Sequence, residues 1–136
     1  MRVRSPPSAP GNDKGRPVFI RRLRERPEFI AGDACRLREL LNARTDKRAY
    51  RYSLAHATVQ AGIATKPHSL RTSEVYYILE GKGRMHVDAE VAEVGPGDAI
   101  DIPPHAVQFI ESIGQADLVF LCIVDPAWSA EDENVL

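Results

Sequence analysis

From Tyr50 to about residue 125, short segments rich in β-forming residues alternate with glycine and proline breakers, and this alternation most limits what the chain can fold into. Closely spaced strands with turn signals between them predict an antiparallel sandwich or barrel. Helical patterns of about 10 to 15 residues do not separate the segments, which argues against a doubly wound parallel sheet. The predicted strands cover residues 51–60, 74–80, 83–88, 90–94, 98–102, 106–112 and 117–124.

The chain divides by composition into four parts. Residues 1–17 are rich in proline, serine, glycine and charge, so we expect a disordered basic arm. Residues 18–49 are predicted to form a strand and helix extension, and residues 50–125 the β-barrel. Residues 126–136 follow as a C-terminal tail, in which three consecutive acidic residues are expected to be solvated and Trp128 to pack back onto the barrel.

Within the extension, the sequence predicts one short strand and one short helix. Val18-Phe19-Ile20 has strand composition. Asp33 is a suitable N-cap for a helix that ends at Asn42. The apolar residues expected on the core-facing side of this helix are Leu37, Leu40 and Leu41. The fold class is therefore all-β with an N-terminal arm and one short helix.

Composition and charge exclude several classes of protein. With 136 residues, the chain has the usual size of one domain. Its longest apolar runs, such as the seven residues 118–124, are far shorter than the roughly 20 residues of a membrane helix. Two unpatterned cysteines predict reduced, buried thiols in a cytoplasmic protein. Residues 1–28 carry a net charge of +5, but they lack the aromatic interleaving of a nucleic-acid-binding segment, so we expect no nucleic-acid partner.

Two segments of the predicted barrel share a regular spacing of glycine, histidine and acid residues. In Gly62–Gly81, five residues separate Gly62 from His68, Glu74 follows six positions later, and Gly81 follows after six more residues. In the second segment, which runs from Gly97 to Ser112, Pro103, His105 and Gln108 hold regular positions. This pair, with its 15-residue spacer, resembles the two motifs of the cupin superfamily. The resemblance covers about residues 50–125 and implies a small, jelly-roll-like, antiparallel cupin barrel.

The resemblance also implies a metal site, from which this chain departs at two positions. Cupins that bind metal use three histidines and one glutamate. His68 and Glu74 match that set, but Leu70 and Gln108 stand where two of the histidines are usual. Leucine has no ligand atom, whereas the amide oxygen of glutamine can coordinate a metal. The expected cofactor is one divalent transition metal (Zn, Fe, Mn or Ni), and a metal-free barrel in which His68 and Glu74 hydrogen-bond to each other is the alternative.

Other histidines could complete such a site. His56 alternates with Thr58 and Gln60 on a predicted strand, so it faces the barrel interior if that face is inward, and we include it among the candidate ligands. His105 lies in a loop near the barrel mouth and stands where the family pattern has glycine. His86 is expected to point outward, because Met85 and Val87 form the core face of its strand.

The same alternation predicts the lining of a ligand pocket. Glu74 is the candidate catalytic residue, since a carboxyl group in the lumen can move protons. The side chains expected to line the substrate pocket are Leu70, Tyr76, Met85 and Ile110.

Two functions remain open at this point. The first, which the sequence favours, is a metal-binding cupin that acts as a small metal-dependent enzyme of the dioxygenase, isomerase, lyase or cyclase class on a small polar molecule held in the barrel lumen. The second is a non-catalytic cupin module that binds a small ligand without metal. In either case the resemblance implies a homodimer, and nothing in the sequence suggests a membrane partner.

Overall fold

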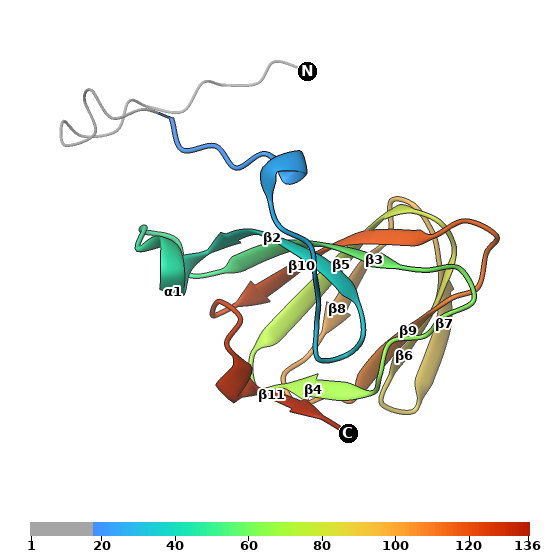
Figure 1. Cartoon of the computed structure of the whole chain (residues 1–136). Helices are drawn as coiled ribbons and strands as arrows, with labels where there is room; N and C mark the ends of the chain where they lie inside the picture. Colours follow the sequence, from blue (N-terminus) through green and yellow to red (C-terminus); the bar gives the residue numbers. More distant parts are fainter. Residues whose placement is uncertain (1–17) are drawn as a thin grey trace, which may run out of the picture.

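The computed structural model describes residues 18–136, and in this part of the chain eleven strands form two antiparallel sheets that face each other (Figure 1). The disordered arm predicted for residues 1–17 lies outside the described residues. The first sheet has the order β1-β2-β3-β10-β5-β8 and the second the order β11-β4-β9-β6-β7. The strands are β1 (Phe29–Ile30), β2 (Arg36–Asn42), β3 (Ser53–Val59), β4 (His68–Leu70), β5 (Ser73–Glu80), β6 (Gly83–Val87), β7 (Glu90–Val94), β8 (Ala99–Ile102), β9 (Gln108–Ser112), β10 (Leu118–Asp125) and β11 (Glu133–Val135).

Strict alternation of inward and outward side chains explains the core. In β10, Leu118, Phe120, Cys122 and Val124 are buried while their neighbours are more exposed. Such a period of two is what a strand with one buried face requires. These side chains meet the inward residues of β5, β6 and β9 between the two sheets, as the jelly-roll-like barrel predicted from the sequence requires. The all-β fold class is thus confirmed.

The predicted helix over residues 33–42 is wrong, because most of that segment is strand β2. The leucines do fit a helical period, but Arg36-Leu37-Arg38 also alternates as a strand does. Pairing with β1 on one side and β3 on the other gives this backbone its hydrogen bonds and overrides the local pattern. The one α-helix in residues 18–136 is α1 (Ala43–Asp46), in a segment predicted as loop.

The chain ends also differ from prediction. Val18–Ile20 is not a strand. Instead, the ring of Phe19 lies under the guanidinium groups of Arg21 and Arg48, with carbon-to-centroid distances of 4.8 and 4.4 Å. Near the other end, β11 pairs with β4 and brings the acidic tail into the second sheet (Figure 1). None of the helices in the described part of the chain is long and apolar enough to cross a membrane.

Candidate functional site

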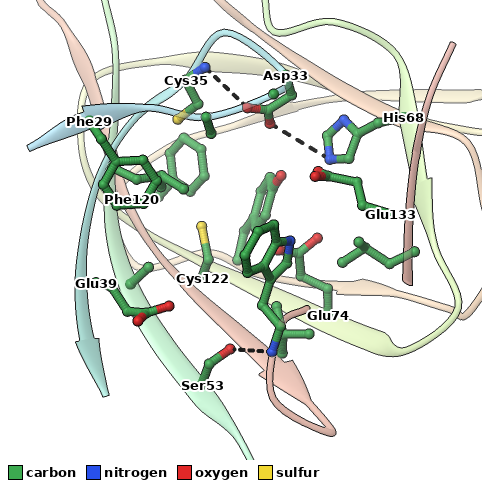
Figure 2. Close-up of a pocket in the computed structure, with 18 of the residues that line it drawn as sticks. Phe29, Asp33, Cys35, Glu39, Ser53, His68, Glu74, Phe120, Cys122 and Glu133 are labelled. Carbon is green, nitrogen blue, oxygen red and sulfur yellow. Dashed lines mark hydrogen bonds and ion pairs between the residues drawn. The ribbon is translucent and has the colours of Figure 1, made fainter. Parts of the chain in front are cut away.

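A pocket of about 240 Å³ opens between the two sheets (Figure 2). Inward residues of β2, β3, β5 and β10 form one wall, and residues of β4 and β11 contribute to the other. The lining is mostly apolar. It consists of Phe29, Ile30, Ala31, Gly32, Asp33, Cys35, Leu37, Glu39, Ser53, Ala55, His68, Leu70, Glu74, Tyr76, Phe120, Cys122, Val124, Trp128 and Glu133.

His68 is held firmly at the start of β4. Its side chain is 3% exposed, and its Nδ1 donates a hydrogen bond of 2.8 Å to the backbone oxygen of Lys66. Because Nδ1 is occupied in this way, Nε2 is the nitrogen that faces Asp33, at 3.7 Å from its Oδ2 (Figure 2). The other Asp33 oxygen accepts a hydrogen bond from the backbone N–H of Cys35. Asp33 is therefore not a helix cap but shapes the turn between β1 and β2 and presents one carboxylate oxygen to the imidazole.

Glu74 is a carboxyl group in the buried interior. It lies on the inward face of β5 beside Tyr76 and is 7% exposed. Burial raises the pKa of Glu74 to about 8; the hydrogen bond from Gln108 opposes this rise, while Asp33 and Glu133 add to it. At neutral pH the group is therefore mostly protonated and can donate a hydrogen bond or a proton.

Gln108 contacts Glu74 through its amide nitrogen. Nε2 donates a hydrogen bond of 2.8 Å to Oε1 of Glu74, and the Gln108 side chain is completely buried. Its Oε1 has no hydrogen-bond partner among the described residues. Gln108 is also the register partner of His68 in the neighbouring strand. The sequence-predicted trio of His68, Glu74 and Gln108 thus lies close together, with the glutamine serving as a hydrogen-bond donor to the carboxyl group.

Three acidic residues of the pocket, Asp33, Glu39 and Glu133, are not among the sequence-predicted site residues. Asp33 was interpreted as a helix cap, and Glu133 as part of a solvated tail. Burial raises the pKa of Glu133, whereas the neighbouring His68 lowers it. No local pattern marks Glu133, because it faces the pocket only through the pairing of β11 with β4. Trp128 does pack back onto the barrel, where its backbone N–H donates to the Ser53 hydroxyl.

Three other predicted site residues lie elsewhere. His56 is on the outer face of β3, because its neighbours Ala55 and Ala57 face inward, and it pairs across the strands with Arg38. The expectation that His56 faces the lumen is wrong. Met85 and Ile110 pack in the hydrophobic core and are not among the residues that line the pocket.

Four other side chains lie where the sequence places them. Leu70 and Tyr76 do line the pocket. His86 points outward, where its Nε2 contacts Glu111 and its ring stacks on Phe109. His105 is exposed and has a φ of 70°, a left-handed conformation that explains why glycine is usual at this position in the family pattern.

The thiols in the pocket are poor nucleophiles. Cys35 and Cys122 are both free and both line the cavity. Burial raises the pKa of each thiol well above its ordinary value. Since the thiolate is the reactive form, neither group is suited to covalent catalysis at neutral pH.

The donor set does not fit a metal ion. In the part of the chain that the structure describes, no group of three or more His, Cys, Asp or Glu side chains is arranged to hold one. Leu70 supplies no ligand atom, and the Gln108 amide turns its N–H, which cannot coordinate, toward Glu74. Metal sites in proteins are generally built from three or more strong donors, and these residues do not provide them.

Fold and pocket together define a class: a two-sheet β-barrel that encloses a pocket between its sheets. The family model of the cupin domain matches residues 55–124, and the chain belongs to the cupin family. It is 44% identical over 109 residues to an uncharacterized protein of Methanocaldococcus jannaschii, MJ1618, a match that covers 79% of this chain and 86% of the relative.

Solved structures share the fold. Oxalate decarboxylase from Bacillus subtilis superposes with a TM-score of 0.71 at 26% identity; the match covers 84% of this chain but only 30% of that enzyme. Work on the same enzyme describes its Mn(II) centres. A predicted oxalate decarboxylase from Thermotoga maritima gives a TM-score of 0.70 at 21% identity, covering 79% of this chain and 99% of the other. A cupin 2 domain-containing protein from Halorhodospira halophila gives a TM-score of 0.63 at 26% identity, with 72% of each chain covered.

Proposed function

We propose that this cupin binds a small organic molecule in the pocket between its sheets without the help of a metal ion. The ligand has an apolar body, matching the aromatic and aliphatic lining, and one polar group that meets His68 and Glu74. This is the second of the two functions that the sequence left open. The lining favours such a molecule over the small polar substrate expected from the resemblance.

The hydrogen bond between Gln108 and Glu74 carries the proposal. This hydrogen bond places a neutral N–H donor at the position where metal-binding cupins have a histidine. It also occupies one oxygen of Glu74, which is the glutamate of the family's metal site. A buried carboxyl group with a pKa of about 8 is held neutral by its surroundings, whereas a bound metal ion would stabilise its anion. The pair is thus suited to hydrogen-bonding a ligand.

The polar groups also define what chemistry is available. Glu74 can donate a proton at neutral pH, and Nε2 of His68 faces the pocket. An acid and an imidazole in an apolar cavity could catalyse proton transfer in a bound ligand. Binding is the primary function that we propose, and turnover would depend on these two side chains.

Elemental analysis of untagged protein purified without chelator tests the proposal. We expect no stoichiometric metal in the wild type, before or after incubation with Fe, Mn, Ni or Zn. The Leu70→His, Gln108→His double variant restores the ligand types of the family and serves as the matched positive control for metal capture. Near-stoichiometric metal in the wild type, lost in the His68→Ala, Glu74→Gln variant, would contradict the proposal and support the metal-dependent enzyme predicted from the resemblance.

A further inference from the structure

The charge of the pocket is strongly one-sided. Four of its lining residues are acidic: Asp33, Glu39, Glu74 and Glu133. His68 is the single basic residue among the described residues of the lining, which include no lysine or arginine. Even with Glu74 protonated, three carboxylates face one imidazole. Uncompensated negative charge in a largely apolar cavity is unfavourable, so a bound cation would stabilise the folded protein.

A second observation points to a ligand at this place. Glu74 is 7% exposed, and its Oε1 accepts the hydrogen bond from Gln108. Its Oε2 has no hydrogen-bond partner among the described residues, although the side chain lines the cavity. A positive charge in the cavity favours the ionised form of Glu74, and the unpartnered Oε2 then accepts a hydrogen bond from an N–H group of the cationic ligand.

Several polar groups lie apart from two of the aromatic rings in the cavity. Figure 2 shows Asp33, His68 and Glu133 gathered at one side and Phe29 and Phe120 at another. Aromatic rings attract cations through their π faces, and they also pack against apolar bodies. The cavity therefore suits a ligand with a charged head and an apolar body.

An inorganic ion would not use this arrangement. The acidic side chains are spread along the lining, and in the described part of the chain they do not converge on one point as metal ligands do. An ammonium group instead forms hydrogen bonds to several separate acceptors while its carbon skeleton fills the apolar space.

We propose that the ligand of this pocket is a protonated organic amine with a compact apolar body. This inference rests on the proposed function and specifies its ligand class. The pocket volume of about 240 Å³ exceeds that of a cavity of about 150 Å³ that admits benzene, so one ring with a short amine-bearing chain can be accommodated. The ammonium group lies between Glu74, Asp33 and Glu133, and the body contacts the aromatic wall.

Three probes with the same phenyl body test the charge preference: 2-phenylethylamine, 2-phenylethanol and 3-phenylpropionate. Isothermal titration calorimetry at pH 7 on the full chain measures each affinity. We expect the amine to bind at least tenfold more tightly than the alcohol and the carboxylate to bind most weakly. If the alcohol or the carboxylate binds as tightly as the amine, the inference is overturned while the proposed function stands.

A matched pair of variants tests whether a carboxylate of the pocket causes the preference for the amine. Glu133→Gln removes one pocket charge from the short terminal strand β11 and should weaken amine binding about tenfold, with little effect on the alcohol. Glu131→Gln makes the same change two residues earlier at an exposed side chain outside the lining, and should leave all affinities unchanged. Equal effects of the two variants, or no binding by any probe, would overturn the inference, and the metal analysis decides separately whether the proposed function holds.

Discussion

Glu74 occupies a position on β5 at which an apolar side chain would satisfy the barrel equally well. Its inward neighbours on the same face, Tyr76 and Ile78, are apolar and fully part of the core. Keeping a carboxyl group there costs stability whenever the group ionises, because no cationic side chain faces it closely enough to offset the burial. A residue with such a cost at the edge of a cavity is typical of a functional site.

This cost predicts an unusual dependence of stability on pH. The pKa of Glu74 is about 8 in the folded protein against an ordinary value of 4.5, so between these values the folded chain binds one proton more than the unfolded chain. The free energy of unfolding therefore falls as pH rises toward 8, by on the order of 2 kcal/mol between pH 6 and 8. Urea unfolding at pH 6, 7, 8 and 9 measures this loss.

Glu74→Gln should remove most of that pH dependence and make the variant relatively more stable at pH 8. Glu90→Gln, an exposed position on β7, is the control and should follow the wild type. Parallel curves for wild type and Glu74→Gln would show that the carboxyl group ionises normally in the folded protein.

At the scale of elements, the turn between β5 and β6 has the tightest packing requirement of the described glycine positions. Gly81 has a φ of 86°, and a Cβ there would lie 2.5 Å from the backbone oxygen of Asp117. Gly62 has a similar φ of 82°, but a Cβ there would contact nothing within 4 Å. The two glycines therefore separate the cost of a left-handed backbone from the cost of a steric clash.

Alanine at each position should show this difference. Gly62→Ala should destabilise the protein by about 1 to 2 kcal/mol, the cost of a left-handed conformation for an L-residue. Gly81→Ala adds the clash and should cost about 3 kcal/mol or more. Denaturant unfolding of both variants checks the order, and equal losses would show that the β5–β6 turn relaxes to admit the methyl group.

Local patterns account for the elements that the sequence could predict. The strands β5 to β8 follow one another through short turns, so alternation and glycine spacing were sufficient to place them. Strand β2 was assigned as a helix because its leucines also fit a helical period, and only distant pairing with β3 decides between the two. Strand β11 is three residues long and depends entirely on pairing with β4, so no local signal predicts it.

Local sequence patterns also predicted only part of the candidate site. Motif spacing was enough to identify His68, Glu74 and Gln108. His68 and Gln108 are register partners in one sheet, and Glu74 meets Gln108 from the other sheet. Asp33 and Glu133 come from segments outside those motifs. They reach the pocket through the turn between β1 and β2 and through the pairing of β11 with β4. Alternation shows that His56 and its neighbours point to opposite faces of β3, but it does not show which of the two faces is inward.

For the whole molecule, strand β1 forms an edge of the six-stranded sheet and is strongly exposed. Phe29 and Ile30 are 46% and 66% exposed, respectively. An exposed apolar edge with unpaired backbone groups readily pairs with a second copy of the same strand. We propose that the homodimer expected from the family resemblance forms through this edge.

Light scattering coupled to size-exclusion chromatography measures the assembly. The wild type should elute with the mass of a dimer, and Ile30→Lys should shift it to a monomer because the added charge would be buried in the interface. Val91→Lys, at an exposed position on the edge strand β7 of the other sheet, should leave the dimer intact. A monomeric wild type would show that no dimer forms. A dimer that is lost only in Val91→Lys would show that the contact lies at β7 and not at β1.

Segments on both sides of the family match, which covers residues 55–124, help to wall the pocket. Phe29 and Asp33 precede that range, and Trp128 and Glu133 follow it. Evolution can therefore change these four pocket residues while the barrel, with His68 and Glu74, keeps its sequence. Relatives that align closely over the barrel can differ in ligand, and a protein engineer could retarget the site by rewriting two short terminal segments.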